Sequence, residues 1–442
     1  MSKPLLIKKL IKPFNKSINV TGDKSLSIRW VLLASQTTGK SRAYNLLMSD
    51  DVLAAINAIK ILGIKVKMKN DYCEIHGNGI NGFKYNKNLT INAKNSGTLG
   101  RLILGLLIKS PFKIKLVGDK SLSKRDFTRI TNPLKKSGAK FFFKKKGRLP
   151  LLISGINQPK KINYIEKKGS AQCKSSVMLA ALNIAGKTLI KAKKSRDHSE
   201  LLFKYLKIPI KIKKNKNYDF IELKNPKKIK PFNYVIPGDI SSSAFFIVLT
   251  VLSESSKLLI KNVNVNPSRI GVIKILKKMG ANISFKNLRD YKGEKISNLL
   301  IKSTKKLRAI NCPTKFNSNA IDEFLIIFLT AAKAKGVSYF KDISELNQKE
   351  SPRLNLGSKI LNMMGVKTKL TKSSIKIYGQ PNLKIKRKII IKNFLKDHRI
   401  FMMSTIAALT FGGSWTIHDP DSIKTSFPSF LETIRKISNI NS

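Results

Sequence analysis

Hydrophobic and polar positions follow a pattern that repeats six times along this chain. In each repeat a short polar segment precedes a strongly apolar run, such as residues 245–249 (FFIVL). Because such a run is apolar on every side, it predicts a helix that is buried all round. An amphipathic helix is predicted further on, as where Val272, Ile275 and Met279 share one face and Lys274 lies on the other. Each repeat therefore predicts a strand, a buried helix, a second strand, an amphipathic helix and further strands.

The predicted amphipathic helices end on a common signal. A glycine follows four of them, and glycine at that place caps a helix because it tolerates the left-handed backbone. The alternating apolar and charged positions that come next are typical of a strand. The four predicted capping glycines are Gly63, Gly138, Gly280 and Gly365.

The polar segments that open the buried helices start roughly 70 to 85 residues apart, a longer period than solenoid repeats usually have. Six repeats divide naturally into three and three. We therefore expect an α/β chain with a first domain at 22–237 and a discontinuous second domain made of 1–21 and 238–442. A cleft between two such domains is a favourable place for substrates, and we expect the active site there. The six segments are 22–25, 95–98, 169–172, 238–241, 320–323 and 396–399.

The first polar segment combines several groups that attract anions. Lys24, Ser25 and Arg29 stand at the start of the first predicted buried helix. The unpaired amides and the dipole of a helix start favour negative charge, and the two cations act in the same direction. This pattern predicts an anion-binding site, although a capped, solvent-facing helix start is the alternative interpretation.

The charge of the chain is extreme. Its 442 residues contain 86 Lys and Arg against 25 Asp and Glu, a formal net charge of +61. Nucleic-acid binding is one interpretation, since it uses clustered basic residues. The lysines are scattered through every segment, however, and Ile and Asn are also abundant, which indicates a drift of composition and a solvated basic surface. We expect no nucleic-acid partner.

The residues that usually bind metals are few and dispersed. The three cysteines, Cys73, Cys173 and Cys312, include no close pair, and there are only four histidines. This spacing fits neither a zinc cluster nor a disulfide framework, so we expect no metal and no cofactor. The N-terminus lacks the pattern of a signal peptide, and the apolar runs are too short to span a membrane. We expect a cytoplasmic monomer without a membrane partner.

Charged residues of the polar segments form a larger candidate site. Arginine binds phosphate and carboxylate groups at two points and keeps its charge, so the set predicts a ligand with several anionic groups. Asp322 and Glu350 are then available for proton transfer. The cations of the set are Lys24, Arg29, Arg125, Lys349, Arg353 and Arg399.

Each of these residues also has a structural interpretation. Arg125 and Arg399 could form ordinary surface ion pairs. Ser170 and Gln172 could cap a helix, and Asp322 could simply favour the dipole of a helix start. The cluster of Lys, Glu and Arg within residues 349–353 is harder to assign to structure alone.

Ten ordered stretches of this chain resemble the enolpyruvyl transferases, and among them the EPSP synthase (3-phosphoshikimate 1-carboxyvinyltransferase) family. The resemblance covers essentially the full length and implies a two-domain inside-out α/β barrel of the α+β type, with three βαβαββ units and buried helices in each domain. It implies transfer of the enolpyruvyl group of phosphoenolpyruvate to the 5-hydroxyl of 3-phosphoshikimate, with release of phosphate. The stretches are 22–29, 95–101, 123–125, 170–175, 195–198, 237–246, 321–323, 349–353, 397–400 and 425–428.

The resemblance also implies roles for individual residues. Asp322 resembles the base that takes the 5-hydroxyl proton, and Glu350 resembles the acid that protonates the methylene carbon, while Lys24 would be catalytic through its charge. The implied ligands of 3-phosphoshikimate are Lys24, Ser25, Arg29, Ser170, Ala171, Gln172, Ser195, Asp322 and Lys349. The implied ligands of phosphoenolpyruvate are Lys24, Gly97, Arg125, Gln172, Arg353 and Arg399.

Two positions depart from the family pattern. Ile28 stands where the family usually has His, and Asp126 stands where Pro is usual. We expect Ile28 to remove a polar group beside the site and Asp126 to place a negative charge next to Arg125. Both changes concern efficiency more than identity.

Three alternatives stay open at this level. A sister transferase that acts on a UDP-amino-sugar shares the implied fold but uses a mobile cysteine, and residues 113–129 contain none. A basic nucleic-acid-binding protein is suggested by the charge alone. An inactive remnant of the family is suggested by Ile28 and Asp126.

Overall fold

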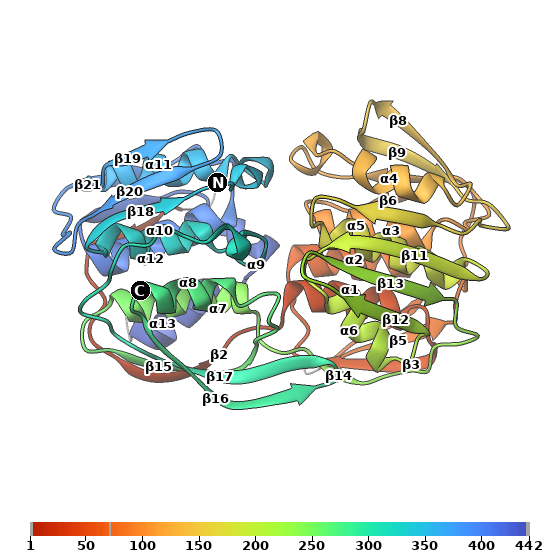
Figure 1. Cartoon of the computed structure of the whole chain (residues 1–442), viewed down its shortest axis with the longest axis horizontal. Helices are drawn as coiled ribbons and strands as arrows, with labels where there is room; N and C mark the ends of the chain where they lie inside the picture. Colours follow the sequence, from red (N-terminus) through yellow and green to blue (C-terminus); the bar gives the residue numbers. More distant parts are fainter. Residues whose placement is uncertain (1–2, 70–71, 439–442) are drawn as a thin grey trace. The chain divides into compact units, whose positions relative to one another are not determined.

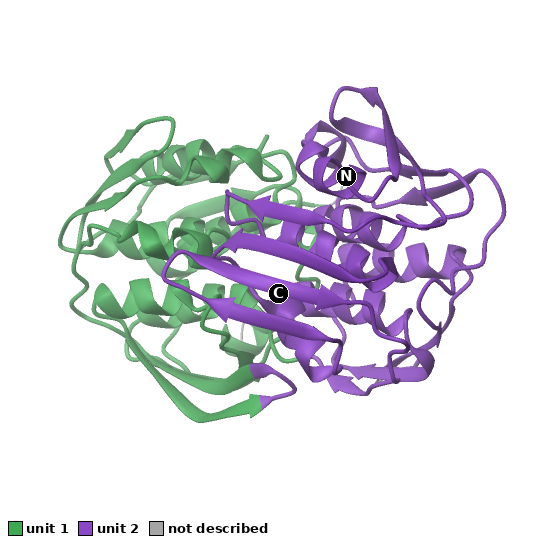
Figure 2. Ribbon diagram, turned by 45° about the vertical axis from the view of Figure 1, so that its right-hand side comes forward, with its two compact units in different colours: residues 1–21, 237–290, 295–442 green, residues 22–236, 291–294 purple. Residues whose placement is uncertain are grey.

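The chain divides into two compact units. The computed structural model describes residues 3–69 and 72–438. Figure 2 colours the units separately. Unit 1 comprises residues 1–21, 237–290 and 295–442, and unit 2 comprises residues 22–236 and 291–294.

Two assignments differ from the expected domains. Pro237 belongs to unit 1, and residues 291–294 belong to unit 2 although they were expected in the discontinuous domain. These four residues are the tip of the hairpin formed by β16 (Asn282–Tyr291) and β17 (Glu294–Lys302). The Tyr291 hydroxyl accepts a hydrogen bond from the Val235 amide at 2.8 Å. Glu294 Oε1 lies 2.6 Å from Nδ1 of His198, and both side chains are buried. Such contacts depend on tertiary structure and leave no mark in the local sequence pattern.

Unit 2 contains two complete repeats of the order βαβαββ. Each repeat folds into a four-stranded sheet in which the first two strands are parallel and the others are antiparallel. The strand orders are β6-β7-β9-β8 and β10-β11-β13-β12. The first of these repeats consists of β6 (Leu89–Asn92), α3 (Gly97–Leu106), β7 (Ile114–Val117), η1 (Leu122–Lys124), α4 (Thr128–Lys135), β8 (Lys140–Lys145) and β9 (Arg148–Ser154). The second consists of β10 (Asn163–Glu166), α5 (Ala171–Ala180), η2 (Ala181–Asn183), β11 (Lys187–Lys193), α6 (His198–Tyr205), β12 (Ile210–Lys214) and β13 (Tyr218–Lys224).

The remaining repeat of unit 2 takes its first strand from the end of the unit. β14 (Tyr234–Val235) pairs in parallel with β3, and the strand order is β14-β3-β5-β4. The chain enters unit 2 at Gly22 and first leaves it after β14, so the start and the end of this long segment meet in one sheet. Its other elements are α1 (Lys24–Ala34), β3 (Thr38–Tyr44), α2 (Asp50–Ile61), β4 (Lys65–Met68) and β5 (Tyr72–Asn78).

The strands of unit 1 form sheets with the orders β16-β17-β15-β2, β18-β20-β19 and β1-β22-β21. Figure 1 labels the strands of the first two sheets. In the second sheet the expected first strand is reduced to isolated bridges from Arg308 to Lys335 and from Asn311 to Tyr339. The N-terminal segment supplies β1 (Leu5–Ile7) and β2 (Asn15–Asn19) to two different sheets of the unit. The other elements are α7 (Ile240–Leu252), β15 (Lys257–Asn264), α8 (Gly271–Lys278), η3 (Thr314–Phe316), α9 (Asn317–Ala320), α10 (Phe324–Lys333), β18 (Gly336–Phe340), η4 (Ser344–Gln348), α11 (Arg353–Met363), β19 (Thr368–Leu370), β20 (Ile375–Gly379), β21 (Lys388–Ile391), α12 (His398–Phe411), β22 (Ser414–Ile417), η5 (Pro420–Thr425) and α13 (Phe430–Ser438).

The helices that follow the polar segments form the core of each unit. In unit 2, α3 contacts both α1 and α5, and in unit 1, α7, α10 and α12 contact one another. Every residue of α7 is buried, as its all-round apolar pattern predicts. The four closing glycines, Gly63, Gly138, Gly280 and Gly365, all have positive φ between 83° and 96°, which confirms the predicted caps. Across residues 3–69 and 72–438, no helix has the length and apolarity needed to cross a membrane.

Candidate active site

Several predicted site residues of unit 2 lie at the N-terminal ends of its buried helices. Asp23 caps α1 by accepting a hydrogen bond from the Leu26 amide at 2.9 Å. This cap starts the helix at Lys24, whose Nζ lies 2.8 Å from Asp51 Oδ2 at the start of α2. The amino group of Lys24, a predicted anion ligand, is thus held beside the start of α2 by the carboxylate of Asp51.

Arg29 lies one turn further along α1 and is only 5% exposed. Its guanidinium donates from Nε to Ser199 Oγ at 2.9 Å and from Nη2 to Ser175 Oγ at 3.1 Å. It also donates from Nη1 to the Ser25 carbonyl at 3.1 Å. Three contacts on three nitrogens hold the plane of the group in one orientation.

A second group of predicted residues meets at the start of α3. Gly97 is the first residue of the helix, and a Cβ atom there would lie 2.9 Å from Nη1 of Arg125 and 3.2 Å from Nη1 of Arg101. Arg101 Nη1 donates to Gln172 Oε1 at 2.6 Å, and Gln172 Nε2 donates to Thr98 Oγ1 at 3.0 Å. The structure thus brings Gly97, Arg125 and Gln172 together.

The third group of unit 2 lies around α5. The Ser170 hydroxyl accepts from the Cys173 amide at 3.3 Å, so its interpretation as a helix cap is confirmed. Ala171 is the first residue of the helix, where backbone amides face outward. Ser195 lies in the loop before α6, and its buried hydroxyl has no hydrogen-bond partner among the residues that the structure describes. A buried hydroxyl of this kind is suited to bind a ligand.

In unit 1 the predicted residues form one ionic cluster around Arg353, which is 2% exposed. Asp397 binds this guanidinium at two points, with 2.9 Å between Nε and Oδ2 and 3.2 Å between Nη2 and Oδ1. Glu350 Oε2 lies 2.5 Å from Nη2. Burial by itself raises the pKa of Asp397, but the charge and hydrogen bonds of Arg353 outweigh it and lower that pKa.

Asp322 joins the same cluster. Its Oδ1 lies 3.3 Å from Nζ of Lys349 and 3.8 Å from Nη1 of Arg353. Arg399 donates from Nη1 to the Asp322 carbonyl at 2.6 Å. All five candidate residues of this half therefore meet: Asp322, Lys349, Glu350, Arg353 and Arg399.

Polar residues outside the predicted ligand and proton-transfer sets extend this cluster into the core. Glu323 is fully buried, accepts a hydrogen bond from Ser241 Oγ and lies 3.9 Å from Nη1 of Arg399. Ser241 in turn accepts from Nη2 of the buried Arg269 at 2.7 Å. Among missed residues of unit 2, Arg101 belongs to a stretch that the resemblance already quoted, so its helical spacing from Gly97 could have found it.

Ile28 and Asp126, the two departures from the family pattern, both have a local structural role. Ile28 is fully buried in the hydrophobic core of unit 2, so it fills apolar space. Asp126 is exposed and accepts hydrogen bonds from the amide and the hydroxyl of Thr128, at 2.8 and 2.6 Å. Its carboxylate therefore stabilises the turn that leads into α4, whose first residue is Thr128.

The three cysteines are buried and carry free thiols. Burial raises the pKa of Cys73 to about 12 and that of Cys312 to about 11, so both thiols stay protonated. Over the described part of the chain, no three His, Cys, Asp or Glu side chains are grouped as metal ligands.

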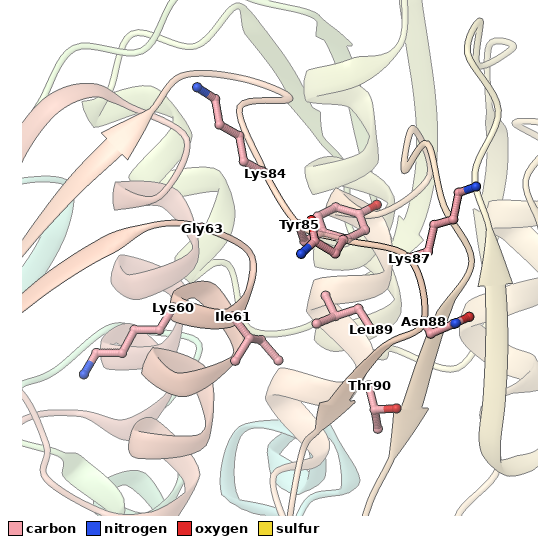
Figure 3. A pocket seen from close by; sticks show the side chains of 10 residues that line it. Lys60, Ile61, Gly63, Lys84, Tyr85, Lys87, Asn88, Leu89 and Thr90 are labelled. Atoms are coloured by element: carbon pink, nitrogen blue, oxygen red, sulfur yellow. The ribbon is translucent and has the colours of Figure 1, made fainter.

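A hollow of about 590 Å³ in unit 2 does not coincide with the predicted site (Figure 3). It lies between the end of α2 and the start of β6, and its lining includes Lys60, Lys84, Tyr85 and Lys87. None of the candidate site residues lines it. Three exposed lysines on so basic a surface are not a specific site.

A family model described as EPSP synthase (3-phosphoshikimate 1-carboxyvinyltransferase) matches residues 8–434. The chain belongs to the EPSP synthase family. A 3-phosphoshikimate 1-carboxyvinyltransferase of Ruthia magnifica subsp. Calyptogena magnifica is 39% identical over 438 residues, which are 98% of each chain. One of Bacillus subtilis (strain 168) is 34% identical over 430 residues, which are 97% of this chain and 98% of the relative.

Solved structures agree with the EPSP synthase assignment. The structure of EPSP synthase from Acinetobacter baumannii has a TM-score of 0.87 and 34% identity, and the match covers 99% of this chain and 98% of that one. The enolpyruvyl transferase NikO from Streptomyces tendae has a TM-score of 0.75 at 13% identity, which shows a shared fold alone. The mixed α/β fold expected from the repeats is thereby confirmed.

Proposed function

We propose that the residues described above carry out the reaction of the EPSP synthase family on this chain. The chain is a transferase that moves the enolpyruvyl group of phosphoenolpyruvate to the 5-hydroxyl of 3-phosphoshikimate. The products are 5-enolpyruvylshikimate 3-phosphate and phosphate, in the shikimate pathway to chorismate and the aromatic amino acids. The observation that carries the proposal is the ionic cluster around Arg353. Its guanidinium lies 3.8 Å from the carboxylate of Asp322 and 2.5 Å from that of Glu350.

We assign 3-phosphoshikimate to a set of cations, hydroxyls and helix starts. Arg29 offers a fixed guanidinium, Ser195 a buried hydroxyl, and Ala171 a helix start whose amides suit an anion. These groups are suited to bind the carboxylate and the phosphate of 3-phosphoshikimate, which is the acceptor of the enolpyruvyl group. The full proposed set is Lys24, Ser25, Arg29, Ser170, Ala171, Gln172, Ser195, Asp322 and Lys349.

We assign phosphoenolpyruvate to the arginines and to the close approach at Gly97. Without a side chain at Gly97, the guanidinium of Arg125 can lie against the backbone at the start of α3. Lys24 stands at a helix start and would contact both substrates. The full proposed set is Lys24, Gly97, Arg125, Gln172, Arg353 and Arg399.

Asp322 is the proposed base that removes the proton of the 5-hydroxyl. Its negative charge is balanced by Lys349 and Arg353, as a base that must act as a carboxylate requires. The oxygen of the acceptor can then attack the central carbon of phosphoenolpyruvate and form a tetrahedral intermediate. Loss of phosphate and return of a proton from the methyl carbon give the product.

Glu350 is the proposed acid that protonates the methylene carbon of phosphoenolpyruvate. Its ion pair with Arg353 favours the carboxylate form, so a proton must reach it when that pair loosens. An anionic substrate that binds Arg353 competes for the guanidinium and brings a negative charge close to Glu350. Both effects favour the protonated acid at the moment it is needed.

We also propose the finer description of the fold. Each unit would be an inside-out α/β barrel, in which buried helices are enclosed by three sheets. The contacts of α3 with both α1 and α5, and the mutual contacts of α7, α10 and α12, support this arrangement. The two units would then be the two domains of the enzyme.

The proposal is tested by measuring phosphate release from phosphoenolpyruvate and 3-phosphoshikimate, with the organic product identified by mass spectrometry. We expect release only when both substrates are present. Exchange of 3-phosphoshikimate for a UDP-amino-sugar should abolish it. Release with the amino-sugar alone, or none with 3-phosphoshikimate, would contradict the proposal.

A further inference from the structure

A layer of buried polar side chains lies behind Arg29 in unit 2, outside the proposed ligand and proton-transfer residues. Ser175 on α5 and Ser199 on α6 are hydrogen-bonded to each other, with 2.7 Å between their hydroxyl oxygens. Each oxygen also accepts a hydrogen bond from a different nitrogen of Arg29. The pair thus fixes two of the three guanidinium nitrogens at once.

The neighbours of these two serines form a buried ion pair. Lys174 and Glu200 are 0% and 3% exposed, and 2.5 Å separates Nζ from Oε1. Since Lys174 precedes Ser175 and Glu200 follows Ser199, the ion pair joins the same two helices directly beside the serine pair. Together the four residues connect α5 to α6 by two adjacent polar contacts.

Burial of these charged and polar side chains contributes little to the stability of the fold, which suggests that they are kept for another reason. Two ions taken from water regain little net stability from their mutual attraction, and apolar residues of similar volume are often as stable. Serines facing Arg29 could likewise be replaced by alanines if packing were their only function. A layer of this kind does restrict geometry, because each hydroxyl has its position set by a partner on the other helix.

We propose that Ser175 and Ser199 are positioning residues that orient Arg29 toward an anionic group of 3-phosphoshikimate, and that the Lys174–Glu200 ion pair holds α5 and α6 in register behind them. This inference rests on the proposed function of Arg29. The serines do not contact the reacting atoms. They act by keeping the guanidinium plane fixed before the ligand arrives.

Removal of the two serine hydroxyls should weaken the binding of 3-phosphoshikimate much more than that of phosphoenolpyruvate. Loss of both hydroxyls removes the serine acceptors of Nε and Nη2 and allows the Arg29 side chain to rotate. Binding of 3-phosphoshikimate should therefore weaken on the order of tenfold to a hundredfold, as expected for hydrogen bonds to a charged group. The KM for phosphoenolpyruvate should change by less than about threefold, because Arg29 is not among its proposed ligands.

The experiment compares Ser175→Ala/Ser199→Ala with the unmodified protein by isothermal titration with 3-phosphoshikimate alone, and by KM and kcat for both substrates. Ser35→Ala is the matched control, since Ser35 is a buried serine that donates to a carbonyl at the end of α1. Ser199→Thr keeps the hydroxyl and should retain near-normal affinity. Lys174→Met/Glu200→Met removes the ion pair without leaving a lone buried charge, and should fold but bind 3-phosphoshikimate more weakly.

The outcomes separate the inference from the function on which it rests. If the unmodified protein does not bind 3-phosphoshikimate, the proposed function of Arg29 fails. If it binds and the double alanine variant binds equally well, the positioning role is overturned. Equal losses for both substrates, or a loss in Ser35→Ala of the same size, would also overturn it by indicating general damage. Normal affinity in the double methionine variant would overturn the role of the ion pair.

Discussion

Arg353 and Asp397 form a two-point ion pair in the interior of unit 1, with Nε to Oδ2 at 2.9 Å and Nη2 to Oδ1 at 3.2 Å. The same Asp397 caps α12 by accepting from the Arg399 amide at 2.9 Å. One carboxylate therefore places two arginines that are proposed ligands of phosphoenolpyruvate. Asp397 is fully buried, so water cannot take over the stabilisation of the Arg353 guanidinium if this carboxylate is removed.

Replacement of Asp397 by Asn should impair both stability and function. The buried guanidinium of Arg353 would lose its main counter-charge, which costs about 3–5 kcal/mol in comparable sites. We expect a large rise in the KM for phosphoenolpyruvate and a lower midpoint of urea unfolding. Asp421→Asn, at an exposed carboxylate near the end of the chain, is the control and should change neither quantity. Unaltered stability in Asp397→Asn would contradict the structural role of the pair.

The ion pair also predicts a pH dependence of stability. Because the pKa of Asp397 is lower in the folded protein than the ordinary value of about 3.9, the unfolded state binds the proton more readily. The stabilisation is complete above the ordinary pKa and is lost as the pH falls through the lower, folded value. Urea unfolding between about pH 6 and pH 3 should show a steeper fall for the unmodified protein than for Asp397→Asn. Parallel curves would show that Asp397 does not contribute to acid sensitivity.

The proton-transfer assignments predict large losses of turnover. Asp322→Ala and Glu350→Ala should each lower kcat by about two to four orders of magnitude, because a general base or acid is removed. Glu345→Ala is a suitable control, since Glu345 is exposed and lies just before Glu350. Initial rates of phosphate release give the comparison. A variant with near-normal kcat would show that the missing carboxylate does not transfer a proton.

Gly97→Ala should affect binding without loss of stability. The added Cβ would lie 2.9 Å from Nη1 of Arg125, which is the mobile end of a long side chain and can move away. Displacement of this guanidinium should raise the KM for phosphoenolpyruvate by roughly tenfold, the effect of about one charged hydrogen bond. Thermal unfolding should be almost unchanged, and a KM equal to that of the unmodified protein would argue against Arg125 as a ligand.

Asp126 offers a test of its charge against its local hydrogen bonds. Asp126→Asn removes the charge but keeps an oxygen for the Thr128 amide, so it should lower the KM for phosphoenolpyruvate modestly and preserve stability. Asp126→Pro removes the charge and both hydrogen bonds to Thr128. It should bring the same change in KM with a loss of stability of about 1 kcal/mol. If neither variant lowers the KM, the carboxylate does not oppose Arg125.

The repeat pattern predicted much of the fold because it is local. Helix starts, all-round apolar helices and capping glycines are written in short segments, and Gly280 illustrates this with a φ of 96°. The ionic cluster of unit 1 was likewise accessible, because Lys349, Glu350 and Arg353 are close in sequence. Partners that meet through tertiary structure were not accessible. Glu323 and Arg269 are linked through Ser241, and no spacing in the chain indicates that link.

Local patterns also gave incomplete answers where one residue type serves two purposes. A carboxylate at position 126 was interpreted only as a charge near Arg125, whereas it also accepts the Thr128 amide in the turn before α4. Ile28 was interpreted as a lost polar group, whereas it is core. In both cases the neighbours in space, which the sequence does not identify, determine the role of the side chain.

The hairpin tip at 291–294 has a consequence for any attempt to obtain unit 2 as a separate polypeptide. A gene fragment for residues 22–236 would encode every helix of that unit but not the tip. The buried His198 would then lose Glu294, and the rings of Tyr205 and Tyr234 would lose the Lys292 ammonium that lies over them at 5.7 Å. Such a fragment lacks part of its own core. It should reach its native packing only when a peptide that spans the β16–β17 hairpin is added in trans.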